Sequence, residues 1–187
     1  MGETEINHRI QLANAKFAEM SNLLQNHKIR LRTRITFLNS YVRSRLTHSC
    51  QNWSLTSAQY NHLDVVYRTF LRRMVRGGFS RQNNNNDDEN QFKLKLTNNK
   101  IHSICNTNDL SEYIKAQQKS YAGHIIRTSM ERTTKRLMFN NDRYVKVGRT
   151  VPSLLDQVVM NDNTTVEGFC NEAMRRRNGN RLRPNLV

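Results

Sequence analysis

The sequence is poor in residues that build disulfide frameworks, tight turns and membrane helices. Its 187 residues include only three cysteines, two prolines and one tryptophan. Cys50, Cys105 and Cys170 lie far apart, which argues against a disulfide framework and indicates free thiols in a reducing compartment. No run approaches the roughly 18 apolar residues that a membrane helix needs, so no membrane partner is expected.

A secretory leader is also missing from the sequence. The first ten residues contain no apolar core of the kind that a signal peptide has. We therefore expect an intracellular protein, in the cytoplasm, the nucleus or both. Apolar residues make up only 36% of the chain, so part of it is expected to be poorly buried.

The motifs of common catalytic and metal sites are absent. The chain has neither a phosphate-binding loop nor a dinucleotide-binding glycine motif, and its His and Cys residues do not show zinc-ligand spacing. Asp87 and Asp88 form a pair of the kind that polymerases use to hold metal ions, but no hydrophobic strand leads into them, so we interpret them as part of a solvated loop. His124 has no evident carboxylate partner, so we interpret it as a packing or hydrogen-bonded structural residue. The sequence predicts no catalytic residue, metal or cofactor, and no enzyme activity of its own.

Positive charge is the feature that the sequence has in excess. Thirty Lys and Arg face 15 Asp and Glu, which gives a formal net charge of +15. Most of these cations are arginine, whose planar guanidinium binds phosphate and stacks on bases. The balance predicts a nucleic-acid partner. A membrane surface is the weaker alternative, because no helix combines an aromatic apolar face with a Lys-rich one.

Apolar spacing predicts three helices in the first half of the chain. Residues 6–24 and 29–48 each carry an apolar seam with steps of three or four, separated by a polar break at 25–28. Two such helices with a short link are expected to form an antiparallel hairpin. A third helix is expected to run to about Arg76, after a capping box formed by Thr56 and Gln59.

The second half is expected to hold shorter helices. Asn98 and Asn108 are the expected caps of helices over 99–105 and 109–127, and a further turn is expected over 133–139. Pro152 is expected at the first position of the next helix. Thr164 and Glu167 form a second expected capping box, which opens a last helix ending at Arg175–Arg177.

The predicted fold class is mainly α, with an antiparallel helical hairpin, additional short helices, an Asn-rich loop and a basic tail. Residues 1–80 form a thumb-like region in this interpretation. Residues 81–97 form an Asn-rich linker. Its part from Arg81 to Gln91 can bury almost nothing, and a short strand or extended piece is expected at Phe92, Leu94 and Leu96. Residues 98–177 form a second helical region, and 178–187 a loose basic tail.

An arginine stripe is the best candidate nucleic-acid contact. Arg68, Arg72 and Arg76 recur every four residues opposite the apolar face of the third helix, so they rise about 6 Å apart and could follow a phosphate backbone. The alternative is an ordinary solvated helix face. In the second helix, Arg30, Arg34 and Arg45 flank the apolar seam on one side. The further candidates are Arg127 and Arg149.

An ordered set of weak motifs points to one family. The first stretch runs from Arg9-Ile10 through Leu38, Tyr41-Val42 and Leu46 to Cys50 and Trp53-Ser54-Leu55. It is followed by Phe70–Met74, by Tyr121-Ala122-Gly123-His124-Ile125-Ile126-Arg127, and by Lys135, Leu137, Gly148-Arg149 and Leu155–Val158. In order and spacing these stretches resemble the region downstream of the palm in LINE-type (non-LTR retrotransposon) reverse transcriptases.

The resemblance covers roughly residues 6–159 and implies a thumb-and-linker role. Such a segment would hold template RNA and nascent primer against a polymerase core supplied elsewhere. Tyr121 and Leu155 stand where the family often has Trp, and the palm with its metal-binding aspartates has no counterpart here. Polymerase activity is therefore not carried over to this chain.

Two other interpretations stay open at this point. The seam over residues 6–46 could pair with another protein, either the missing polymerase core or a second copy of the chain. The chain could also be a decayed retroelement remnant without an independent function.

Overall fold

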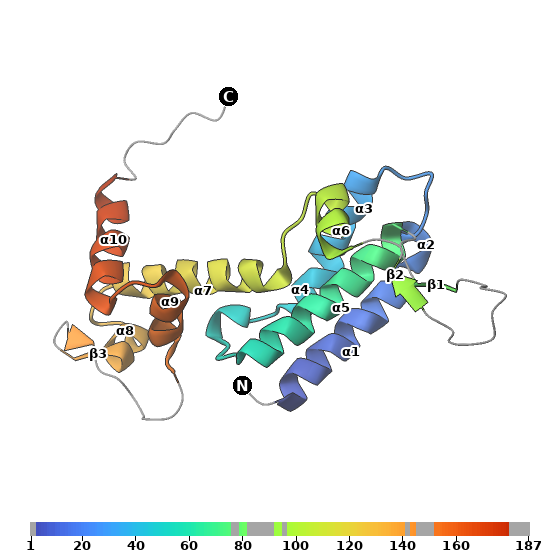
Figure 1. Ribbon diagram of the computed structural model, residues 1–187. Helices are drawn as coiled ribbons and strands as arrows, with labels where there is room; N and C mark the ends of the chain where they lie inside the picture. The colour runs from blue at the N-terminus through green and yellow to red at the C-terminus, as the bar shows by residue number, and fades with distance from the viewer. Residues whose placement is uncertain are drawn as a thin grey trace. The chain divides into compact units, whose positions relative to one another are not determined.

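The computed structural model describes residues 3–75, 79–81, 92–94, 97–140, 143–144 and 152–179. It is mainly helical, as predicted (Figure 1). Most of the predicted Asn-rich linker and basic tail, residues 82–91, 95–96 and 180–187, lies outside the described residues, as do Arg76 and Arg149. Among the described helices, none has the length and apolar character needed to cross a membrane.

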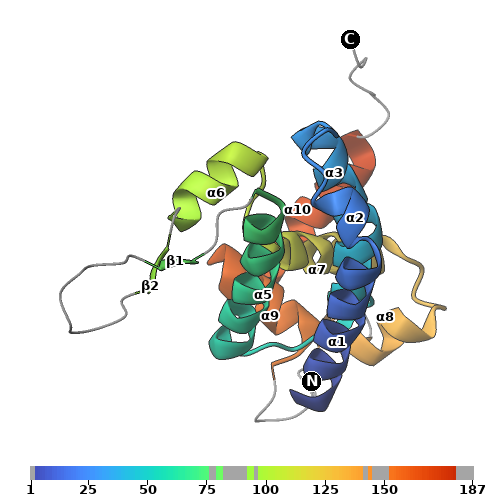
Figure 2. The ribbon, with the colours of Figure 1, turned by 90° about the vertical axis from the view of Figure 1, so that its right-hand side faces the viewer.

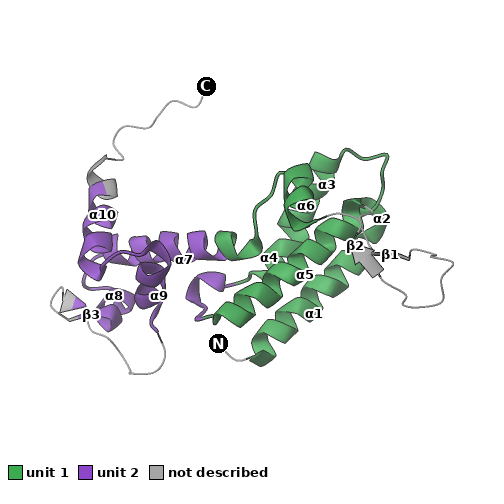
Figure 3. Ribbon diagram, viewed as in Figure 1, with its two compact units in different colours: residues 1–48, 55–113 green, residues 49–54, 114–187 purple. Residues whose placement is uncertain are grey.

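The chain forms two compact units, coloured separately in Figure 3. Unit 1 comprises residues 1–48 and 55–113, and unit 2 comprises residues 49–54 and 114–187. The division predicted from composition put a linker at 81–97 instead. The boundary differs because α6, which follows that stretch, packs on the helices that precede it.

Unit 1 opens with the helical hairpin. Its first arm is α1 (Glu3–Glu19) with the short α2 (Ser21–Leu24), and its second arm is continuous through α3 (Leu31–Phe37), the π-helix η1 (Leu38–Arg43) and α4 (Ser44–Leu46). Because α2 lies beside α3 while α1 lies beside η1 and α4, the two arms run antiparallel. The break after Glu19 and the π-turn were not predicted.

Helices α5 (Ser57–Val75) and α6 (Asn98–Cys105) complete unit 1. Figures 1 and 2 both show α5 alongside α1, and the rings of Phe17 and Phe70 stack between them with centroids 5.0 Å apart. Two short strands, β1 (Phe79–Arg81) and β2 (Phe92–Leu94), pair antiparallel between α5 and α6. The largest fully buried side chains here are Tyr67, Phe17, Phe70, Ile6, Leu24, Leu38, Leu46, Leu63, Leu71, Met74, Ile101 and Leu110.

Unit 2 gathers around the second part of α7 (Leu110–Arg127). It contains the 3-10 turn η2 (Cys50–Asn52), α8 (Thr133–Met138), the strand pair β3 (Phe139–Asn140) and β4 (Arg143–Tyr144), α9 (Leu154–Asp162) and α10 (Val166–Gly179). The core of this unit consists of Ala122, Ile126, Phe139, Leu155, Val158, Phe169 and Ala173. The segment 49–54 joins it because the Gln118 amide donates to the Trp53 carbonyl at 2.7 Å.

The predicted helix starts were correct in one case and displaced in others. Thr56 and Gln59 form the expected reciprocal capping box of α5, at 3.0 and 3.3 Å. The cap of α6 is Thr97 rather than Asn98, because the Thr97 hydroxyl accepts the Lys100 N–H. Helix α7 likewise begins at Leu110, one residue later than expected.

The helices of unit 2 show the same displacement. Pro152 precedes the cap of α9 instead of opening the helix, because Ser153 and Asp156 form a capping box. At α10 the Thr165 hydroxyl, not that of Thr164, accepts the N–H of Gly168 at 3.1 Å. The turn expected over 133–139 ends at Met138.

Candidate nucleic-acid interface

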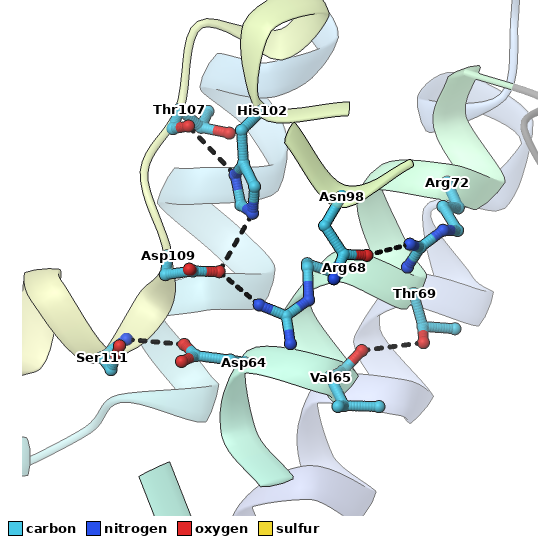
Figure 4. A network of polar contacts seen from close by, with 10 residues as sticks. All are labelled: Asp64, Val65, Arg68, Thr69, Arg72, Asn98, His102, Thr107, Asp109 and Ser111. Atoms are coloured by element: carbon cyan, nitrogen blue, oxygen red, sulfur yellow. Dashed lines mark hydrogen bonds and ion pairs between the residues drawn. The ribbon is translucent and has the colours of Figure 1, made fainter. Parts of the chain in front are cut away.

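The predicted arginine stripe on α5 is part of an internal polar network (Figure 4). Arg68 Nη1 lies 2.5 Å from Asp109 Oδ1, just before α7, and the Arg68 side chain is only 15% exposed. Arg72 Nη2 donates to the side-chain oxygen of Asn98, on α6. Arg68 is thus held by a part-buried ion pair, whereas the bond of Arg72 to Asn98 is exposed and joins α5 to α6.

His102 and Asp64 extend this network. The Nδ1 of His102 lies 3.0 Å from the Thr107 carbonyl oxygen, to which a protonated Nδ1 can donate. Its Nε2 lies 3.0 Å from Asp109 Oδ1, within range of an ion pair when the imidazole is protonated. The buried Asp64 carboxylate accepts the Ser111 N–H at 2.7 Å. The network therefore ties α5 to α6 and to the start of α7.

Arg34 is a buried structural cation, contrary to its prediction as a nucleic-acid contact. Its side chain is 5% exposed. Its Nη1 donates to the carbonyls of Leu24 at 3.1 Å and Met74 at 2.8 Å, and its Nε donates to Ile29 at 3.1 Å. Carbonyls at helix ends lack intrahelical donors, and a buried arginine satisfies them here.

The other predicted contacts divide between exposed and tethered positions. Arg30 and Arg45 are exposed on the second arm of the hairpin. Arg127, in unit 2, is half-buried and donates to the Ala173 carbonyl at 3.5 Å. Of the predicted contacts in the described residues, Arg30 and Arg45 are the two that remain solvent-facing.

Arg32 and Arg73 are exposed cations outside the set of contacts predicted from the sequence. The Arg73 guanidinium carbon lies 5.4 Å from the centroid of the Phe17 ring. Arg73 also lines a cavity of about 300 Å³ whose other walls are Ser21, Asn22, Gln25 and Asn26. The sequence does indicate this position for Arg73, because Arg73 follows Phe70 by three residues and so borders the apolar face of the helix. Long basic side chains at such positions pack their aliphatic part on apolar neighbours.

An exposed aromatic side chain lies among the cations of the hairpin. Tyr41, on the π-helix, is 47% exposed and stacks on Phe37 with centroids 6.2 Å apart. Lys16 Nζ lies 5.8 Å from its centroid and is paired with Glu19 at 2.6 Å. That lysine lowers the pKa of the Glu19 carboxyl, chiefly through this hydrogen bond. Aromatic rings beside cations are common on single-strand-binding surfaces.

The cysteines do not form reactive centres. Burial raises the pKa of the Cys50 thiol to about 11 and also raises the pKa of Cys105 and Cys170. Thiols in such surroundings stay protonated at neutral pH and are poor nucleophiles. In the part of the chain that the structure describes, no three His, Cys, Asp or Glu side chains come together as a metal site.

Comparison with known proteins gives no match. No family model, no curated protein and no solved structure is similar to this chain at a significant level. The resemblance to LINE-type reverse transcriptases therefore stays a prediction from the motifs.

Proposed function

We propose that the chain is a nucleic-acid-binding helical module, similar in role to the thumb-and-linker segment of a LINE-type reverse transcriptase. The observation that carries the proposal is the net charge of +15, which remains after every acidic side chain is matched with a basic one. Its partner would be RNA, DNA or a hybrid of the two, with the polymerase core supplied by another polypeptide or segment.

Unit 1 supports this proposal through the cations that its own fold leaves in solvent. Glu5, Glu19 and Asp109 are already paired with basic side chains within the unit. For several exposed cations the structure shows no ion pair among the described residues, namely Lys28, Arg30, Arg32, Arg45 and Arg73. Such residues can neutralise phosphates and release condensed counterions, which gives affinity with little sequence preference.

A salt series tests the proposal. The probe is a fluorescently labelled RNA–DNA hybrid, and binding of the full chain is followed by anisotropy. We expect tight binding at low salt and a steep decrease in log K with log salt. An Arg30/Arg32/Arg45→Gln variant should lose about 0.9 units of slope for each phosphate contact removed, or nearly three in all.

The matched control removes the same charge from unit 2. Arg132, Arg136 and Arg175 are also exposed, and their triple Gln variant lowers the net charge equally. We expect this control to retain most of the slope. Equal losses in both variants would contradict a contact face on unit 1. A wild-type chain that does not bind at low salt would overturn the proposed function itself.

A further inference from the structure

The cavity beside Arg73 has the composition of an anion site. It has a volume of about 300 Å³ and lies between the α2 end of the hairpin and the C-terminal turn of α5. Its walls are one arginine, one hydroxyl and three carboxamides: Arg73, Ser21, Asn22, Gln25 and Asn26. Every one of these side chains can donate a hydrogen bond, and none of the described residues that line the cavity carries a carboxylate to compete for the guanidinium.

Aromatic packing holds the cation of this cavity in place. The Arg73 guanidinium lies over the Phe17 ring at 5.4 Å, and that ring is stacked on Phe70 in the buried core. A cation over an aromatic face keeps its N–H groups at the ring's periphery free to donate. Arg73 therefore lies against an apolar partner, and among the described residues the structure shows no ion pair for it.

A buried cation fixes the two walls of the cavity relative to each other. Arg34 donates to the carbonyl of Leu24, adjacent to Gln25, and to the carbonyl of Met74, adjacent to Arg73. It thereby joins the α2 wall to the α5 wall. Carbonyls at a helix C-terminus would repel an anion, and Arg34 compensates two of them.

One carboxamide is also oriented by the backbone. The Asn26 side-chain oxygen accepts the Lys28 N–H at 3.0 Å. Because the Oδ1 of Asn26 already accepts this hydrogen bond, its Nδ2 is the group that can donate to a ligand. The cavity is thus biased towards acceptor ligands with several oxygens.

We propose that this cavity binds a phosphate group of nucleic acid, with Arg73 as the charged ligand and the Asn22 and Gln25 amides as neutral donors. The inference rests on the proposed function and specifies one contact within it. Phosphate suits the site because a planar guanidinium forms paired hydrogen bonds to its oxygens. The group could be an internal diester or a terminal monoester, and the two are separable by experiment.

The test compares charge removal inside and outside the cavity. The probes are RNA–DNA hybrids with a 5′-phosphate or a 5′-hydroxyl on the RNA strand. Arg73→Gln should reduce the salt slope by about 0.9 and should weaken binding more than the equally charged control Arg132→Gln. Arg73→Lys should recover part of the affinity. Circular dichroism and urea unfolding of each variant would show whether loss of the Phe17 contact alters the fold.

A charge-neutral variant makes the test specific to the cavity. Asn22 and Gln25 are exposed, so an Asn22→Ala/Gln25→Ala variant should fold normally. Loss of two donors to a bound phosphate should weaken binding about fivefold or more, with the slope almost unchanged. A diffuse electrostatic role for Arg73 would leave this variant equal to wild type.

The outcomes separate the inference from the function on which it rests. A 5′-phosphate preference that Arg73→Gln abolishes would assign the cavity to a terminal monoester. Equal binding of both probes, weakened alike by the cavity variants, would assign it to an internal diester. Wild-type binding that none of the cavity variants changes beyond Arg132→Gln would overturn the phosphate site alone. Absence of wild-type binding would overturn the proposed function.

Discussion

Arginines of similar sequence context have different roles in this fold. Arg30 and Arg34 flank the same apolar seam one helical turn apart, yet Arg30 is exposed and Arg34 is buried. The sequence predicts both as surface cations because charged residues are seldom buried. Two of the three carbonyl partners of Arg34 lie 10 and 40 residues away along the chain, and no local pattern identifies them.

We predict that Arg34→Met destabilises the protein by about 3 kcal/mol. The methionine would fill part of the volume, but the carbonyls of Leu24 and Met74 would lose their buried donor. An unsatisfied buried polar group costs about 1–3 kcal/mol. Urea unfolding followed by circular dichroism would measure the change.

Arg32→Met is the matched control for this change. Arg32 lies two residues earlier on the same helix and is exposed, so its replacement should alter the free energy of unfolding by no more than about 0.5 kcal/mol. Similar effects of the two substitutions would show that the Arg34 hydrogen bonds contribute little to stability.

At the scale of elements, apolar spacing located the helices better than it located their ends. The existence of the hairpin arms, of α5 and of α7 follows from steps of three and four. The first residue of each helix depends on which of two adjacent residues has a side chain that accepts a backbone N–H of the first turn. At α10 the left-handed backbone of Asn163 (φ 52°) ends α9, and the chain then turns so that Thr165, not Thr164, caps the next helix.

The π-helix η1 could not be predicted from the apolar spacing of the sequence. The seam through Leu38, Val42 and Leu46 keeps ordinary helical spacing, so it carries no sign of the wider turn. A long-range contact accompanies the turn, because the Tyr67 hydroxyl donates to the Asn39 side-chain oxygen at 2.8 Å. Only the packed structure shows this partner on α5.

The position of the α10 cap at Thr165 can be tested by substitution. Thr165→Ala should destabilise the protein by about 1 kcal/mol, because the Gly168 N–H would lose its capping acceptor. Thr164→Ala should stay within about 0.5 kcal/mol, since that exposed neighbour is the matched control. Urea unfolding of both variants would measure the difference. The opposite order of effects would support the capping box expected from Thr164 and Glu167.

For the whole molecule, apolar spacing predicted the helical class, whereas the division of the chain suggested by composition differs from the two compact units of the structure. The Asn-rich stretch suggested a boundary at 81–97 because such a composition buries little. The structure instead divides α7 between Tyr113 and Ile114, where composition does not change. Compact units are defined by packing, and α6 packs on α3 and α5.

Ile101 is the side chain on which the placement of α6 can be tested. It is fully buried in α6, so Ile101→Ala should create a cavity and cost about 3 kcal/mol. Ile104, on the same helix, is 40% exposed, and its alanine variant should cost less than about 1 kcal/mol. Amide hydrogen exchange would show where the stability is lost. If α6 belongs to unit 1, Ile101→Ala lowers protection in α3 and α5, because these are the helices on which α6 packs. Reduced protection confined to α7–α10, with α3 and α5 unchanged, would instead place α6 with the later helices and the boundary at 81–97.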